Sequence, residues 1–383
     1  MKRCILHIGQ SKTGSSAIQS FLNLNKKRLK KSGILYPGVK LHGVTLDLFN
    51  HNPVADSLSG LKSYPEVEAE EYFRQFSQLL IKDDCQTLAL SGEHFFGGEP
   101  RVWNVQSKEE HITAYRNKLK ALHYFLKDYA VTIIIYLRDQ LEWTESAISQ
   151  VIRYEGLIGK KIYHNDRQFF ELMKPMLDYE NLLEQWLGIL EPKKLICIPY
   201  KKDDLQGNNS VSDFLWQLGI NDDYLIGKAV GHKEHESLSR EYIELKKTLN
   251  KEACSKTEEW VRINCLNKAN SKMNMGEKYK ISYDLYRQIQ KYYLNMNARI
   301  TEKYIKKGTF SINVRENYSV DTYDIDHVSK ARKYFYKEYY SFSTKIKRLE
   351  INVKKYLRTH VKPVHVILYK IKMIVRKNLF HYR

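Results

Sequence analysis

The sequence predicts an α/β protein with three layers, in which helices cover both faces of a central parallel sheet. Short apolar segments have the length and composition of buried strands, at residues 4–8, 87–90, 131–137 and 195–198. Longer segments with apolar residues three and four positions apart separate them, as amphipathic helices do. Strands that alternate with helices are typical of a parallel sheet, because helices make the crossover connections.

The strand at 131–137 is the clearest, because it is rich in β-branched residues and apolar on both faces. It ends at Arg138. The other strands end just before Gly9, Ser91 and Tyr200. Ligands of parallel sheets bind beyond the C-terminal ends of the strands, so we expect these four residues at one edge of the sheet.

Helical spacing of apolar residues recurs along most of the remaining chain. We expect helices at 17–33, 67–82, 108–128, 141–153, 168–190, 211–218 and 238–249. Residues 38–65 are rich in loop-forming residues and are predicted as a loop.

The segment that joins the first strand to the first helix predicts an anion site. It contains two glycines, one lysine and four hydroxyl side chains within residues 9–16. First-turn amides of a helix lack intrahelical partners, and the helix dipole adds positive charge there. Gly9 and Gly14 allow the backbone to approach a ligand closely, and Lys12 supplies a full charge. The alternative is an ordinary strand-to-helix turn with a capping serine.

The order of residues in this loop distinguishes two kinds of phosphate loop. A Walker A loop places its lysine after the second glycine, whereas Lys12 precedes Gly14. The sequence Lys-Thr-Gly-Ser-Ser at 12–16 instead resembles the 5′-phosphosulfate loop of PAPS-dependent sulfotransferases, in their bacterial and glycan-modifying branch. The resemblance implies a P-loop-like fold and a nucleotide-binding role for the loop residues Ser11, Lys12, Thr13, Gly14, Ser15 and Ser16.

A second motif extends the resemblance. Arg138 ends a strand and Ser146 follows eight residues later, after a helix has begun, as in the 3′-phosphate motif of the same family. Arginine suits bidentate binding of phosphate, and the serine adds a hydroxyl donor. The alternative for Arg138 alone is a salt bridge at a strand end. The resemblance covers about residues 3–310 and implies that these two residues hold the 3′-phosphate of PAPS.

The family chemistry implies further roles. Lys12 would neutralise charge on the oxygen that bridges sulfur and the 5′-phosphate, without an obligatory metal. A general base should deprotonate the acceptor hydroxyl, and in such enzymes it is a glutamate or a histidine. Glu93 is the first choice because it follows the second strand. His51 is the second choice and His94 the third, and each of the three has a structural alternative.

The composition of the chain limits the classes of partner that the protein is expected to bind. The formal charge of +19 indicates an anionic partner, and 43% hydrophobic residues can fill a core. The five cysteines are widely spaced, which predicts neither a disulfide framework nor a zinc site. No apolar leader precedes the first strand, and no segment reaches the length of a membrane span. We therefore expect a cytoplasmic protein of bacterial type, with a glycan or glycolipid acceptor.

The C-terminal part differs from the rest. We divide the chain into a sulfotransferase-like domain at 1–315 and a basic, aromatic-rich helical tail at 316–383. Residues 329–383 carry 11 lysines and 5 arginines against 2 glutamates, and 364–375 is largely apolar. A basic amphipathic helix on the inner face of an anionic membrane fits this pattern, and a solvated or packed extension is the alternative. Nucleic acid is an unlikely partner because no recognised binding module accompanies the charge.

Two other function classes stay open. The loop at 9–16 could serve a P-loop nucleotide kinase or NTPase, which predicts dependence on magnesium. The chain could instead be a non-enzymatic basic protein that binds membranes, which predicts that Lys12 is dispensable.

Overall fold

A computed structural model describes most of the chain. It covers residues 2–41, 44–60, 65–97, 108–158, 162–230, 237–252, 254–273, 277–315 and 325–341, with 344, 348, 351 and 352.

The central sheet has five strands, all parallel, in the order β2-β5-β1-β6-β7. The strands are β1 (Lys2–His7), β2 (Ile34–Leu35), β5 (Thr87–Ser91), β6 (Tyr129–Leu137) and β7 (Lys194–Pro199). His7 of β1 lies opposite Ser91 of β5 and Ile134 of β6, and Leu137 lies opposite Pro199. The C-terminal ends of these strands therefore share one edge, which confirms the predicted position of Gly9, Ser91, Arg138 and Tyr200.

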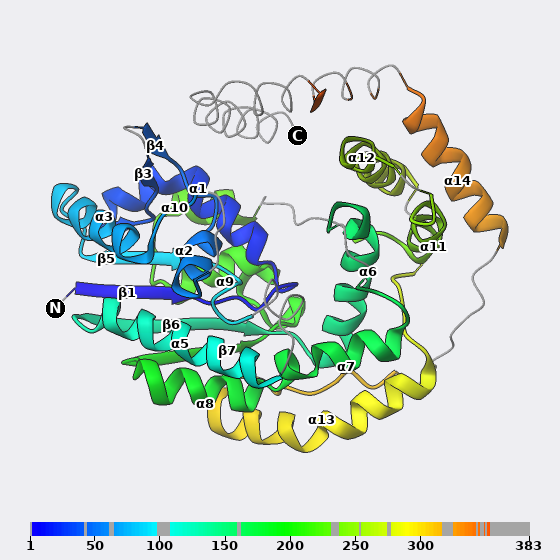
Figure 1. The fold of residues 1–383 in the computed structure, drawn as a ribbon. Coiled ribbons are helices and arrows are strands. Elements are labelled where there is room, and N and C mark those ends of the chain that lie inside the picture. The colour runs from blue at the N-terminus through cyan, green and yellow to red at the C-terminus, as the bar shows by residue number, and fades with distance from the viewer. Residues whose placement is uncertain are drawn as a thin grey trace.

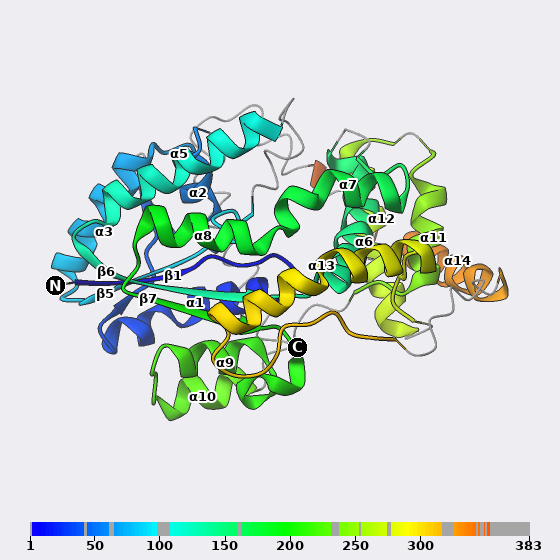
Figure 2. The same cartoon turned by 90° about the horizontal axis from the view of Figure 1, so that it is seen from below.

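Side chains of the sheet pack into two apolar layers. On one face, Ile133 and Ile135 join the core with three helices, α3 (Ala69–Lys82), α5 (Lys108–Leu126) and α8 (Tyr179–Leu190). On the other face, Ile134 and Tyr136 pack with α1 (Ser15–Lys31), α9 (Ser210–Gln217) and α10 (Asp223–Val230). Figure 2 shows α5 and α8 on one side of the strands and α9 and α10 on the other. The predicted α/β fold with a covered parallel sheet is confirmed.

Two local predictions were wrong. Residues predicted as a loop at 38–65 include an antiparallel hairpin of β3 (Val39–Leu41) and β4 (Val44–Leu46), and a helix α2 (Asn52–Leu58). The proline there stands in the first turn of α2, where it suits a helix start. The single helix predicted at 168–190 is two helices, α7 (Asp166–Leu177) and α8. Asp178 caps α8, since its carboxylate accepts a hydrogen bond from the Asn181 amide.

A second group of helices lies beyond the C-terminal ends of the strands (Figure 1). It comprises α6 (Gln140–Ile158), α7, α11 (Arg240–Leu249), α12 (Lys256–Lys272) and α14 (Ile325–Tyr339), and it is joined by α13 (Tyr283–Tyr304), whose C-terminal end runs back beside β7. The amide side chains of Gln140 and Asn297 exchange two hydrogen bonds of 2.8 Å, which join α6 to α13. This group of helices stands at the edge of the sheet where the predicted site residues gather.

The described part of the tail is packed rather than separate. Ala331 and Phe335 of α14 are buried, and α14 packs against α11 and α12. Glu338 of α14 forms an ion pair with Lys272 of α12 at 2.5 Å. The division at residue 315 stays a prediction. The apolar segment at 364–375 lies outside the described residues. Among the residues that the structure covers, no helix combines the length and apolar character that crossing a membrane requires.

Candidate functional site

The loop between β1 and α1 is the centre of the candidate site. Gly9, Lys12 and Gly14 have φ values of 98°, 68° and 77°, in the left-handed region. A Cβ at Gly9 would lie 3.0 Å from the Cα of Glu93, so only glycine fits against that neighbour. Lys12 adopts this conformation although it has a side chain, and such backbone is concentrated at functional sites.

Side chains inside the loop are bonded to its own backbone. The carbonyl of Gln10 accepts hydrogen bonds from the hydroxyls of Thr13 at 2.6 Å and Ser15 at 3.1 Å. Across the described residues, the backbone N–H groups of Thr13, Gly14, Ser15 and Ser16 have no acceptor. Successive unpaired amides at a helix N-terminus form the kind of site that binds phosphate oxygens.

Arg138 contacts this loop directly. Its Nη1 donates to the carbonyl of Lys12 at 3.1 Å, and its Nε and Nη2 donate to Glu142 Oε2 at 3.2 and 3.1 Å. Its guanidinium is therefore adjacent to the loop residues predicted to bind the other end of the nucleotide. Two motifs that are 126 residues apart in sequence meet within one site.

Two further side chains join the loop to the rest of the edge. Gln10 accepts a hydrogen bond from the Arg138 amide at 3.1 Å and donates to the Tyr179 hydroxyl at 2.5 Å. Trp143 of α6 donates through Nε1 to the hydroxyl of Ser11 at 3.3 Å. The loop is thus held from β6, α6 and α8 at once.

Ser146 lies one helical turn beyond Glu142 on α6 and is half-buried. The spacing of four residues puts Ser146 on the same face of α6 as Glu142, which binds Arg138. Ser146 therefore lies on the face of α6 whose Glu142 binds Arg138, the other half of the predicted 3′-phosphate motif.

Glu93 is close to the loop, as expected for a residue after β5. Its Oε2 accepts a hydrogen bond from the Ser15 hydroxyl at 3.2 Å. The structure therefore brings Glu93 together with the loop, next to the start of α1.

His51 is placed differently. Its side chain is fully buried, Nδ1 accepts from the Ser91 amide at 3.0 Å, and Nε2 donates to the Pro37 carbonyl at 3.2 Å. Burial lowers the pKa of His51 to about 4. Both ring nitrogens are used in supporting the end of β5, so the structure does not bring His51 to the loop as an available base.

His94 has a carboxylate partner. Its Nδ1 lies 2.8 Å from Asp56 Oδ1, and the two side chains are 21% and 9% exposed. A carboxylate at one ring nitrogen orients the imidazole and strengthens it as a base. Of the two histidines that the sequence suggested, His94 therefore has the arrangement more typical of a proton acceptor.

Carboxylates also gather at the start of α6. Asp139 caps the helix by accepting from the Glu142 amide at 2.9 Å. Burial, with the nearby charge of Glu142, raises the pKa of Asp139 to about 7. Burial also acts to raise the pKa of Glu142, but Arg138 and Asn313 outweigh it and the net pKa is lowered. Asp139 is thus the member of this group that titrates near neutral pH.

The Asp139→Asn variant is expected to change how stability depends on pH. Between pH values of about 4 and 7, Asp139 is protonated in the native protein and ionised in the unfolded chain, so the free energy of unfolding falls as pH rises. Asparagine caps helices well and does not ionise. We expect the stability of the variant relative to the wild type to rise by roughly 2–3 kcal/mol between pH 5 and pH 8. Urea unfolding at both pH values measures this, and an equal difference at both would contradict it.

Sequence reasoning missed four residues of the site: Gln10, Glu142, Trp143 and Asn313. Asn313 donates to Glu142 Oε1 at 2.8 Å and so extends the Arg138–Glu142 pair. Glu142 could have been found, because it stands four residues after Arg138 near a helix start. Trp143 and Asn313 had no such signal, since only the packing of α6 against the loop and the later chain gives them a role.

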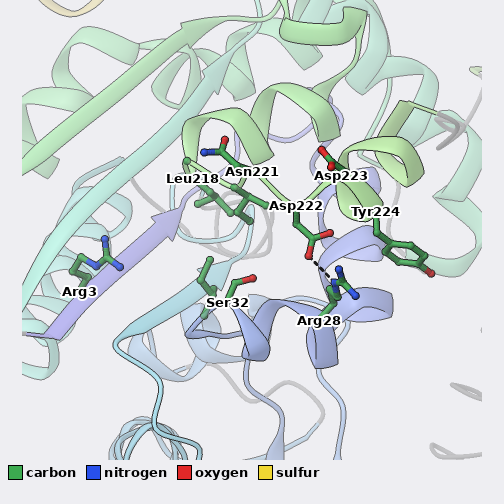
Figure 3. Close-up of a pocket in the computed structure, with 11 residues that line it drawn as sticks. Arg3, Arg28, Ser32, Leu218, Asn221, Asp222, Asp223 and Tyr224 are labelled. Atoms are coloured by element: carbon green, nitrogen blue, oxygen red, sulfur yellow. Dashed lines mark hydrogen bonds and ion pairs between the residues drawn. The ribbon is translucent and has the colours of Figure 1, made fainter.

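A separate cavity opens at the opposite edge of the sheet (Figure 3). It has a volume of about 600 Å³, and Arg3 at the start of β1 contributes to its lining. Arg28 at the end of α1 pairs with Asp222 at 2.6 Å across it. The cavity therefore lies away from the loop at 9–16, which follows the other end of β1.

Comparisons of the chain with protein-family models, curated proteins and solved structures found no match. Among the described residues, His, Cys, Asp and Glu side chains do not gather in groups of three or more that could hold a metal ion. A functional proposal therefore depends on the residues of the site.

Proposed function

We propose that the protein is a PAPS-dependent sulfotransferase with a P-loop-like core. The observation that carries the proposal is the 3.1 Å hydrogen bond from Arg138 Nη1 to the Lys12 carbonyl. It brings a loop that resembles a 5′-phosphosulfate site into contact with an arginine that resembles a 3′-phosphate ligand. A single adenosine carrying both groups would contact both motifs.

The loop would hold the 5′ end of the nucleotide. The unpaired amides of Thr13, Gly14, Ser15 and Ser16 supply donors, and Lys12 supplies charge. The Ser11 hydroxyl accepts a hydrogen bond from Trp143, so it can still donate its own hydrogen to an oxygen of the ligand. Arg138 and Ser146 would hold the 3′-phosphate, with Arg138 exchanging Glu142 for the phosphate.

Sulfuryl transfer needs position and charge stabilisation more than covalent catalysis. The acceptor hydroxyl oxygen forms a bond to sulfur while the bond between sulfur and the bridging oxygen breaks. That oxygen keeps the electron pair, and adenosine 3′,5′-bisphosphate leaves. The hydroxyl proton passes to a general base. Lys12 and the loop amides stabilise the charge on the departing oxygen.

Glu93 is the preferred base because its carboxylate contacts the loop through Ser15. His94 is the second candidate, on the strength of its 2.8 Å contact with Asp56. The two residues are adjacent in sequence and follow the same strand, so both stand at the edge of the sheet that carries the loop.

The acceptor is proposed to be a hydroxyl of a bacterial glycan or glycolipid. The excess of basic residues suits an acidic acceptor, and the described α14 has an exposed side that includes Lys330, Arg332, Lys333 and Lys337. Residues 329–383 would hold the enzyme peripherally at an anionic membrane, on its cytoplasmic face.

A nucleotide kinase or NTPase is the second candidate. The observation that favours it is the 3.2 Å contact between Ser15 and Glu93, because a hydroxyl and a carboxylate at a phosphate loop can hold magnesium. This candidate predicts that ATP with magnesium binds tightly and that Arg138 contacts no phosphate group of the bound nucleotide.

Binding of adenosine 3′,5′-bisphosphate tests the proposal. By calorimetry without magnesium, we expect this nucleotide to bind at least about 100-fold more tightly than AMP, because AMP lacks the phosphate that Arg138 would bind. ATP with magnesium should bind no better than AMP. Tight ATP binding that needs magnesium would favour the kinase instead, and no nucleotide binding would favour a non-enzymatic membrane protein.

A further inference from the structure

A buried lysine supports the turn that carries Glu93. Lys118 of α5 is 2% exposed, and its Nζ donates to the carbonyls of His94 at 2.8 Å, Phe95 at 2.6 Å and Gly97 at 3.4 Å. The ammonium also lies 4.5 Å from the centre of the Tyr115 ring. Burying an ammonium is costly unless its protons are bonded, and here one cation meets three carbonyls of a single turn.

The same turn is anchored from the other side by its amides. The Gly92 amide donates to the His7 carbonyl at 3.0 Å, and the Phe96 amide donates to the Ile8 carbonyl at 3.2 Å. Phe95 and Phe96 of the turn are themselves buried. The amides therefore hold the turn to the end of β1, and the carbonyls hold it to Lys118.

Glu93 lies between these two anchors. Its Cα packs against Gly9, and its carboxylate accepts from Ser15. Neither sequence neighbour of Glu93 is a large apolar residue, because Gly92 precedes it and half-buried His94 follows it. Its position relative to the loop therefore depends on the bonds that fix the backbone at 92–97.

We propose that Lys118 is a positioning residue that holds Glu93 against the loop at 9–16. Its role in catalysis rests on the proposed sulfotransferase function, whereas its role in fixing the turn does not. A misplacement of about 1 Å at a reacting group lowers rates about 100-fold, so a loosened turn should slow transfer without weakening nucleotide binding to the amides and Arg138.

The first test measures the turn directly. Lys118→Met keeps the length of the side chain and removes the cation, and Lys120→Met is the matched control on the exposed side of the same helix. Hydrogen exchange of the Phe96 and Gly97 amides should be at least about 10-fold faster in Lys118→Met than in the control. Equal exchange in the two variants would overturn the proposal, whatever the protein catalyses.

The second test measures transfer of sulfate from PAPS to water, which needs no identified acceptor. Lys118→Met should lower the rate about 10- to 100-fold while the Kd of adenosine 3′,5′-bisphosphate changes less than threefold. In a Glu93→Gln background, Lys118→Met should have no further effect, since Lys118 acts through Glu93. Additive effects would overturn the proposal. A wild type that binds no bisphosphate would instead refute the sulfotransferase function.

A third variant covers the case in which Lys118→Met does not fold. Lys118→Ala leaves space for a small amine beside the three carbonyls. Adding n-propylammonium should restore slow exchange of the Phe96 amide, and n-propanol, of similar size but uncharged, should not. Equal effects of the two compounds would mean that Lys118 only fills space, and would overturn the proposal.

Discussion

Replacing Lys12 with methionine is expected to lower the rate of sulfuryl transfer from PAPS about 10²- to 10³-fold. Charge develops on the bridging oxygen as its bond to sulfur breaks, and Lys12 is the cation of the loop that would offset it. Methionine keeps the length of the chain but carries no charge. Single-turnover release of sulfate from labelled PAPS measures the effect.

Lys27→Met is the matched control for this variant, because Lys27 lies on α1 but is exposed. It should transfer sulfate at the wild-type rate. Affinity for adenosine 3′,5′-bisphosphate should fall less than the rate in Lys12→Met, since the loop amides still hold the 5′-phosphate. Equal losses of rate and affinity would mean that Lys12 binds the nucleotide without stabilising the transition state. An unchanged rate would remove Lys12 from the mechanism.

Replacing Arg138 with alanine is expected to weaken binding of adenosine 3′,5′-bisphosphate about 100-fold and binding of AMP less than threefold. The guanidinium would make charge-assisted hydrogen bonds to the 3′-phosphate, and AMP has no phosphate there. Calorimetry with both nucleotides measures the difference. Equal weakening of the two would show that the variant disturbs the loop through the lost bond to the Lys12 carbonyl.

Glu142→Gln separates these possibilities, because Glu142 occupies the Nε and Nη2 donors of Arg138 in the structure. A phosphate must displace this carboxylate to reach those donors. The variant should therefore bind adenosine 3′,5′-bisphosphate as tightly as the wild type or several-fold more tightly. Weaker binding would mean that Glu142 holds Arg138 in its binding position.

Regular elements could be predicted where local pattern and burial agree. The strand β6 is apolar at every position from 133 to 137, and its β-branched residues suit only a covered sheet. The hairpin β3–β4 could not be predicted in this way, because each strand has three residues. Its support comes from elsewhere, since Gln75 of α3 bonds both to the amide and to the carbonyl of Lys40.

The candidate site was partly predictable for a similar reason. Residues of the loop are contiguous, so their order could be read directly. The order of preference among the candidate general bases could not be predicted from the sequence, because it depends on contacts between different helices and strands. The sequence shows that His51 and His94 are both present, but not what each imidazole contacts. In the structure His51 bonds to the backbone of Pro37 and Ser91, whereas His94 contacts the carboxylate of Asp56.

Local sequence by itself determined the parallel α/β core, the loop at 9–16 and the arginine at the end of β6. Short-range periodicity and residue order are sufficient for each, because strand burial and helix starts act over a few residues. Tertiary structure alone decided that Arg138 touches the Lys12 carbonyl, that Gln10 and Trp143 hold the loop, and that Lys118 binds the turn of Glu93. These contacts join residues far apart in the chain, and sheet order and helix packing set their geometry.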